Sequence, residues 1–256
     1  MSVIWSRSVR AMNPLQTGRT TRRARFAVPA GRVLINAGSR VGFAAGFLAF
    51  VLAGAVSAQH RISLSGDVQA KISYCKDCHG VSAQGFNGYY PIPRLAGQQP
   101  EYIENQLRAF IEHRRTNNIM FNVAHSLSPA MINALTAHFA SLNPPPIGGA
   151  PRQLVATGRK IFEDGMPEVN IAACAACHGP EATGSGQIPR LAGQLYPYMI
   201  KTLGSWDKER GRNPTVPDAA AIMSPVAHSL NKSQIEAVAA FVSTLRSPRG
   251  TPNAVQ

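Results

Sequence analysis

Two short stretches, Cys75-Lys76-Asp77-Cys78-His79 and Cys174-Ala175-Ala176-Cys177-His178, decide the fold of this 256-residue chain. Both have the pattern C-x-x-C-H, and together they use all four cysteines of the sequence. This pattern is the attachment signature of a c-type haem, because two cysteines three residues apart can form thioether bonds to the two vinyl groups of one porphyrin. The histidine that follows then binds the iron. The sequence therefore predicts two covalently bound haem c groups, with Cys75, Cys78, Cys174 and Cys177 as attachment points and His79 and His178 as proximal iron ligands.

The alternatives to haem attachment are a four-cysteine zinc site and a thiol redox pair. The two C-x-x-C pairs of a zinc site are usually separated by roughly 15 to 20 residues, whereas these copies begin 99 residues apart. A redox disulfide does not need the histidine that follows each pair. Both observations favour haem attachment, which leaves no thiol for a disulfide.

The first 58 residues have the layout of an export signal. They contain eight of the 26 basic residues and none of the 13 acidic residues, and they end in the apolar run 41–58. Val56, Ser57 and Ala58 offer the small residues that a signal peptidase reads, so we predict cleavage before Gln59. The alternative is an uncleaved anchor, although the run is short for a spanning helix and is diluted by glycines. Export and covalent haem together predict a periplasmic bacterial protein, either free or attached to the outer face of the inner membrane.

The charge of the mature chain depends on this leader. The full sequence has a net charge of +13, but the residues after position 58 keep 18 basic and 13 acidic side chains, a net charge of +5. The propionates of two haems add about four carboxylates and bring the holoprotein close to neutral. The basic composition is therefore no evidence for nucleic-acid binding, and redox proteins are the expected partners. No acid-base carboxylate pair, nucleophile triad or phosphate loop in the sequence points to a small-molecule substrate.

The two haem motifs belong to a unit that occurs twice. The block Ile-Pro-Arg-Leu-Ala-Gly-Gln at 92–98 recurs at 188–194, and the block Val-Ala-His-Ser-Leu at 123–127 recurs at 226–230. The order of the blocks is kept while the loop lengths differ, which indicates a tandem duplication. After the signal at 1–58 we predict four parts: domain 1 at 59–143, a proline-stiffened linker at 144–151, domain 2 at 152–247 and a tail at 248–256.

Both domains are predicted to be helical, giving an all-α fold class. Apolar residues recur at helical spacing in four segments, and no segment shows sustained strand alternation. These residues are Ile103, Leu107, Phe110 and Ile111; Ile132, Leu135, Phe139 and Leu142; Ile200 and Leu203; and Ile235, Val238, Val242 and Leu245. Ser128 with Pro129, and Asn231 with Gln234, are typical of helix starts. Because each domain is small, we expect the haem to supply much of its apolar core.

The duplication also selects the second axial ligand of each iron. Met120 and Met223 each lie three residues before a Val-Ala-His-Ser-Leu block, in what we expect to be loop sequence, whereas Met131, Met166 and Met199 have no counterpart in the other copy. We predict that Met120 and Met223 bind the two irons. The histidines of the block, His125 and His228, pass the same positional test. Bis-histidine coordination therefore stays open, and it would give a lower reduction potential.

The order of these motifs resembles the cytochrome c4 family of dihaem cytochromes over nearly all of residues 67–247. Each C-x-x-C-H is followed by P-x-L-A-G-Q, a helix, a basic turn, Met, V-A-x-x-L and a terminal helix. The resemblance implies two tandem class I cytochrome c domains. It also implies that the carbonyls of Pro93 and Pro189 accept the ring N–H of the proximal histidines. For Arg94 and Arg190, which follow these prolines, we expect either a surface position or a salt bridge to a haem propionate.

The expected function is electron transfer, because an iron with two axial ligands has no open site for a substrate. The electrons would pass from a quinol-oxidising complex or a dehydrogenase to a terminal oxidase. The alternatives are a cytochrome subunit of a dehydrogenase complex and a dihaem enzyme of the peroxidase or thiosulfate-oxidising type. The second copy carries inserted residues and Trp206, so we expect two different reduction potentials.

Overall fold

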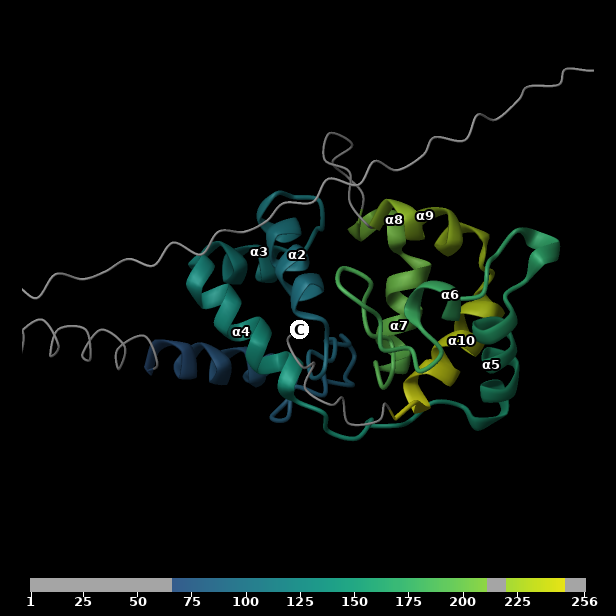
Figure 1. Ribbon diagram of the computed structural model, residues 1–256, viewed down its shortest axis with the longest axis horizontal. Helices are drawn as coiled ribbons and strands as arrows, with labels where there is room; N and C mark the ends of the chain where they lie inside the picture. The colour runs from purple at the N-terminus through teal and green to yellow at the C-terminus, as the bar shows by residue number, and fades with distance from the viewer. Residues whose placement is uncertain (1–65, 211–219, 247–256) are drawn as a thin grey trace, which may run out of the picture. The chain divides into compact units, whose positions relative to one another are not determined.

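The computed structural model describes residues 66–210 and 220–246 (Figure 1). The predicted export signal at 1–58, its cleavage point before Gln59 and the predicted tail at 248–256 lie outside these residues. The described residues of both copies belong to one structural unit. Among them, no helix is both long enough and apolar enough to cross a membrane. The all-α prediction is confirmed, because helices form the regular structure of the described ranges and the extended pairings there are isolated bridges such as that of Phe86 with Ile92.

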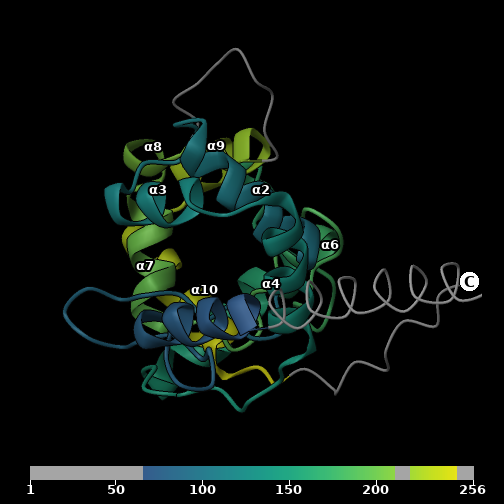
Figure 2. The same cartoon turned by 90° about the vertical axis from the view of Figure 1, so that its left-hand side faces the viewer.

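The first copy is built from a helix at residues 66–79 followed by α2 (Pro100–Ile111), α3 (Asn118–His125) and α4 (Pro129–Ser141). Both α2 and α4 begin with a proline, whose fixed φ suits the first helical turn. The Ser128 side chain caps α4 by accepting from the backbone N–H of Met131 at 3.2 Å. Figure 2 shows α2 beside α3, and α2 also packs against α4. Their buried faces carry the predicted apolar residues Ile103, Leu107, Phe110, Ile132, Leu135 and Phe139.

The second copy repeats this plan with more short elements. Its helices are α5 (Val155–Asp164), α6 (Ala175–His178), α7 (Tyr196–Gly204), α8 (Trp206–Glu209), α9 (Ala220–Ser229) and α10 (Lys232–Thr244), and 3₁₀ turns lie at Arg152–Leu154 and Pro167–Val169. The capping box predicted for Asn231 and Gln234 begins α10. Figure 1 shows α10 beside both α5 and α7, against which it packs.

Helices α5 and α10 approach most closely at Gly158. A Cβ atom on this residue would lie 1.9 Å from the carbonyl oxygen of Ala237. Around this crossing, Phe162 of α5 and Val242 of α10 are completely buried. Gly158 therefore lets the backbones of α5 and α10 approach each other closely.

The expectation that the two candidate methionines lie in loops is wrong. Met120 is in α3, where the side chain of the N-cap residue Asn117 accepts from the Met120 backbone N–H at 2.9 Å. Met223 is in α9. Helix α3 has only eight residues, too few turns for its apolar spacing to show in the sequence. Its start is set by a single capping side chain.

The expected surface position of Arg94 and Arg190 is also wrong, because only 3% and 8% of these residues are exposed. Arg94 donates from Nη2 to the carbonyl of Pro144 at 2.7 Å and from Nε to the carbonyl of Ala96 at 2.9 Å. Residues 144–151 have no regular secondary structure, so their carbonyls are free to accept. The predicted linker is thus held to the first copy by hydrogen bonds as well as stiffened by its prolines.

Candidate haem sites

The first C-x-x-C-H motif forms the last turn of the helix at 66–79, and the second motif forms the one-turn helix α6 with its N-cap. Cys75 and Cys78 are in the last turn of the helix at 66–79, where residues three apart share one face. Cys174 is the N-cap of α6 and Cys177 lies inside that helix. In both copies the first thiol is half-buried and the second is exposed, and all four are free. Each pair therefore presents two thiols on one side of a turn, as attachment of one porphyrin requires.

The thiols are poorly suited to the alternative roles. Burial raises the pKa of the Cys75 thiol and raises that of Cys174 to about 11. A reactive redox pair needs a thiolate and hence a lowered pKa. Within the described ranges, moreover, no group of three or more His, Cys, Asp or Glu side chains could hold a metal ion. These observations favour haem attachment over a thiol redox pair or a zinc site.

Both candidate proximal histidines are buried, with 7% of His79 and 4% of His178 exposed. Nδ1 of His79 lies 2.8 Å from the carbonyl oxygen of Pro93, and Nδ1 of His178 lies 2.9 Å from that of Pro189. These are the contacts that the resemblance implies. A carbonyl oxygen only accepts hydrogen bonds, so Nδ1 carries the proton and the lone pair of Nε2 is free to bind iron.

Burial also keeps these imidazoles in the state that a metal needs. It lowers the pKa of His79 and His178, and the hydrogen bond to each proline carbonyl opposes this only in part. Both rings are therefore neutral at pH 7, the form in which histidine binds a metal.

A tight turn after each histidine brings the proline carbonyl back to the ring. Gly80 and Gly179 follow the histidines with φ of 87° and 77°, which favours glycine. A Cβ on Gly80 would lie 2.7 Å from the carbonyl oxygen of Gly85. The carbonyl of His79 accepts from the N–H of Gly85 at 2.7 Å, and that of His178 accepts from Gly184 at 2.8 Å. The same local geometry is thus built twice.

The structure places each candidate methionine against the core of its own copy. Met120 packs against the buried cluster of the first copy, as does Cys75. Met223 packs against the cluster of the second copy, as does Cys174. The attachment cysteine and the methionine of each copy thus border one apolar region.

The rival histidines are exposed and belong to neither apolar cluster. His125 is exposed and its ring stacks on Phe121 at a centroid distance of 5.6 Å. His228 is exposed as well, with Nδ1 donating to the Ser224 carbonyl at 2.7 Å and Nε2 pairing with the carboxylate of Asp207. Both ring nitrogens of His228 are therefore occupied. These positions favour methionine over histidine as the sixth ligand.

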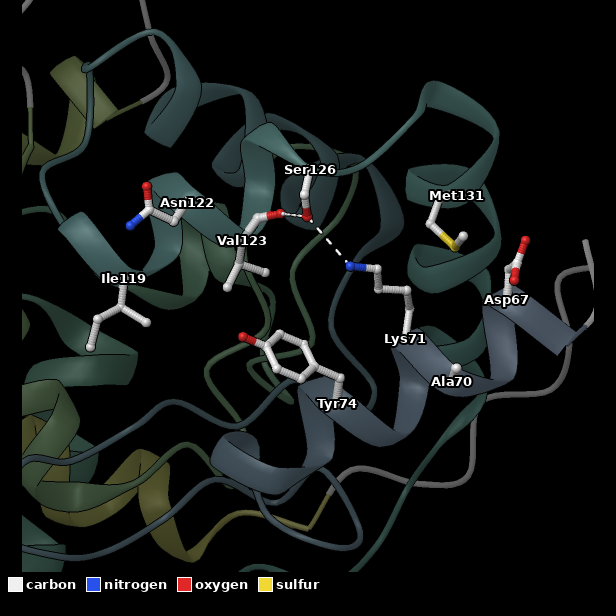
Figure 3. Close-up of a pocket in the computed structure, with 9 residues that line it drawn as sticks. All are labelled: Asp67, Ala70, Lys71, Tyr74, Ile119, Asn122, Val123, Ser126 and Met131. Atoms are coloured by element: carbon white, nitrogen blue, oxygen red, sulfur yellow. Dashed lines mark hydrogen bonds between the residues drawn. The ribbon is translucent and has the colours of Figure 1, made fainter.

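A cavity of about 720 Å³ lies between the helix at 66–79 and α3 (Figure 3). Figure 3 shows Tyr74 and Val123 on opposite sides of it, with Met131 from α4 at one end. Neither Cys75 nor His79 nor Met120 lines this cavity. It is therefore distinct from the candidate ligands of the first haem, and Met131 belongs to it.

Two buried side-chain N–H groups of the second copy are candidate hydrogen-bond donors to a haem. The indole Nε1 of Trp206 and the guanidinium Nε of Arg210 are buried, and neither has a hydrogen-bond partner among residues 66–210 and 220–246. Arg210 stacks over the Trp206 ring at 4.8 Å, and Trp206 packs against the same apolar cluster as Cys174 and Met223. Two unpaired N–H donors beside this cluster fit the carboxylate of a haem propionate. The sequence alone does not assign Trp206 a role in binding a propionate. The presence of this residue in only one copy, next to a basic turn, is the feature that could have indicated such a role.

Comparison with known proteins agrees with this arrangement. The Cytochrome c family model matches residues 155–246. Cytochrome c4 of Thiocapsa roseopersicina is 36% identical, over 71% of this chain and 91% of that protein. The thiosulfate dehydrogenase electron acceptor of Thiomonas intermedia is 34% identical, over 66% of this chain and 76% of that protein. The solved cytochrome c4 of Acidithiobacillus ferrooxidans superposes with a TM-score of 0.57 at 35% identity, covering 68% of this chain and 99% of that one.

The relatives and the two C-x-x-C-H motifs agree on two covalently bound haem c groups and on electron transfer as the general activity. The similarity extends through both copies of the repeat, and the structure is helical in both. The chain is a member of the cytochrome c4 family of dihaem c-type cytochromes.

Proposed function

We propose that this dihaem electron carrier binds each iron between a histidine and a methionine, His79 with Met120 and His178 with Met223. The observation that carries the proposal is the pair of buried imidazoles whose Nδ1 is held by a proline carbonyl, at 2.8 Å in one copy and 2.9 Å in the other. Bound haem supplies one-electron exchange between ferric and ferrous iron. The protein fixes the tautomer of each histidine and brings a thioether to the same apolar region.

In the second copy we propose that Trp206 Nε1 and Arg210 Nε donate to a haem propionate. The proposal is supported by the burial of these two atoms, for which the described residues offer no hydrogen-bond partner. Burying an unpaired donor costs about 1 to 3 kcal/mol, so a carboxylate at this place stabilises the fold as well as the haem.

We further propose that the protein works in the bacterial periplasm, free or at the outer face of the inner membrane. There it carries electrons from a quinol-oxidising complex or a dehydrogenase to a terminal oxidase. The proposal is supported by the acid-free basic leader with its apolar run and by the covalent mode of haem attachment.

A second candidate is a role as the cytochrome subunit or dedicated electron acceptor of a dehydrogenase complex. The similarity to the thiosulfate dehydrogenase electron acceptor of Thiomonas intermedia favours this candidate and points to thiosulfate dehydrogenase as the donor class. Both candidates use the same six-coordinate haems. A dihaem enzyme would instead need one iron with an exchangeable ligand.

The test uses the mature holoprotein. We expect a haem content of two per chain, a far-red charge-transfer band of iron–methionine bonding in the oxidised protein, and no binding of carbon monoxide by the reduced protein. Loss of one haem's sixth-ligand signature in His125→Ala, with no effect of Met120→Ala, would overturn the methionine assignment. Carbon monoxide binding by the native protein would favour the enzyme. Reduction by a thiosulfate dehydrogenase with thiosulfate, compared with reduction by a quinol-oxidising complex, separates the two electron donors.

A further inference from the structure

The side chains of Gln98 and Gln194 join the two copies of the repeat. Each ends one Ile-Pro-Arg-Leu-Ala-Gly-Gln block, and each is only 6% exposed. Gln98 accepts through Oε1 from the backbone N–H of Arg190 at 2.7 Å and donates through Nε2 to the Arg190 carbonyl at 3.0 Å. Gln194 makes the same two bonds with the backbone of Arg94, at 2.8 Å and 3.2 Å. Backbone N–H groups only donate and carbonyls only accept, so these partners fix the orientation of both amides.

Gln98 thereby bonds the peptide unit that holds the proximal histidine of the other copy. The N–H of Arg190 and the carbonyl of Pro189 belong to one peptide unit, and that carbonyl accepts the ring N–H of His178 at 2.9 Å. A chain of hydrogen bonds thus runs from Gln98 in the first copy, through the peptide, to His178 in the second copy.

The reverse chain has the same form. It runs from Gln194 in the second copy to the N–H of Arg94 at 2.8 Å, and from the Pro93 carbonyl of that peptide to His79 at 2.8 Å. Each proximal histidine is therefore reached by a glutamine of the opposite copy.

We propose that Gln98 and Gln194 are positioning residues that tune the reduction potential of the haem in the opposite copy. This inference rests on the proposed function, in which His79 and His178 bind iron through Nε2. Hydrogen bonds in a chain polarise one another, so an acceptor on the peptide N–H makes the carbonyl of the same peptide a stronger acceptor. A stronger hydrogen bond at Nδ1 makes the histidine a more basic ligand. A more basic ligand favours ferric iron, which lowers the potential.

Loss of the Gln98 acceptor should therefore raise the potential of the haem on His178. Cooperative strengthening of about 10 to 30 per cent for one charge-assisted bond corresponds to roughly a twofold change in the ratio of reduced to oxidised haem at a fixed potential. For a one-electron couple, at 59 mV per tenfold change, this is about 20 mV.

The experiment compares the holoprotein with the variants Gln98→Met and Gln194→Met. Methionine keeps the length and unbranched shape of glutamine and removes both amide groups. The matched control is Gln99→Met, because the Gln99 side chain also crosses between the copies, donating to the Thr183 carbonyl at 2.9 Å, but bonds neither proximal peptide. Haem content and the far-red band are measured first. A native protein with fewer than two haems would refute the proposed function, and the inference with it. With two haems and the far-red band present, the potentials of the variants test the inference alone.

Potentiometric titration gives the two potentials, and the ring N–H proton resonances of His79 and His178 in the diamagnetic reduced protein assign them. We expect Gln98→Met to raise the potential of the haem on His178 and to move that ring proton upfield, with the haem on His79 unchanged. Gln194→Met should do the reverse, and Gln99→Met neither. A shift confined to the haem of the same copy, an equal shift of both haems, or no shift overturns the proposal.

If one variant does not fold, the other tests the proposal by itself, because the two chains of hydrogen bonds have the same form. If neither folds, hydrogen exchange of the Arg94 and Arg190 amides in the native protein decides. Slow exchange of both amides supports the chains, and fast exchange of either one overturns the proposal.

Discussion

Replacing Gly158 by alanine should destabilise the second copy, because α5 and α10 meet at this residue without room for a side chain. A Cβ atom there would lie 1.9 Å from the carbonyl oxygen of Ala237 and 2.9 Å from Cβ of Phe241, whereas ordinary contact begins at 3.4 Å. Alanine is intrinsically better than glycine within a helix by about 1 kcal/mol. Forcing extra volume into a packed core costs about 1 to 3 kcal/mol, occasionally more. Because the contact is with a backbone atom, which cannot change rotamer as a side chain can, we place the overpacking cost at the upper end of this range. After the gain in helix propensity, we expect the free energy of unfolding to fall by about 2 kcal/mol.

The assay is guanidinium chloride unfolding of the holoprotein, followed by far-ultraviolet circular dichroism and by the far-red band. We expect Gly158→Ala to lower the unfolding midpoint of the second copy and to weaken methionine ligation at its haem first. Gly204→Ala at the end of α7 is the matched control, since a Cβ there meets no atom of the described residues within 4 Å. Its stability should be unchanged or slightly higher. A Gly158→Ala protein as stable as the native one would refute the close approach of the two helices.

Three further predictions concern the second copy. Trp206→Phe keeps the ring under Arg210 but removes the donor proposed for a propionate. The potential of that haem should fall by roughly 20 to 40 mV, which corresponds to about a third of the free energy of such a hydrogen bond. An unchanged titration curve would contradict the contact. Met223→Ala should remove the far-red band of one haem and let reduced iron bind carbon monoxide, while Met199→Ala, at a buried methionine without a counterpart in the first copy, should do neither. The Ser224 carbonyl and Asp207 raise the pKa of His228, so this contact stabilises the fold below the ordinary histidine pKa of about 6.5 and the effect is lost as pH rises through the raised value. Asp207→Asn should lower that pKa in an NMR titration of the ring protons, and an unmoved titration would exclude the pair.

Features with a local cause could be predicted from the sequence. The capping box of Asn231 and Gln234 forms because its two side chains need only the backbone of their own first helical turn. Ser128 caps α4 for the same reason. The haem motifs are equally local, since the thioether positions and the proximal histidine lie within five consecutive residues of each copy.

Features with a distant cause could not be predicted in this way. Arginine is rarely buried, so its charge alone predicts exposure for Arg94 and Arg190. Their burial depends on acceptors far along the chain, the Pro144 carbonyl for one and the Asn143 side chain, at 3.3 Å, for the other. Helix α3 was not predicted for a different reason. It has eight residues and a single buried position, Ala124, so its sequence shows no helical spacing of apolar residues.

The duplication explains how one short block can both orient a ligand and join the two copies. In each block the proline carbonyl faces the histidine of its own copy, while the glutamine five residues later reaches the backbone of the other block. Because the blocks are the same, the glutamine amide of each one finds its donor and its acceptor on the arginine backbone of the other, and no additional residue type is needed to build this contact. The proline of each block therefore acts on the proximal histidine of its own copy, and the glutamine acts on the peptide that supports the histidine of the other copy. Each block thus contributes to both haem sites, but through different residues.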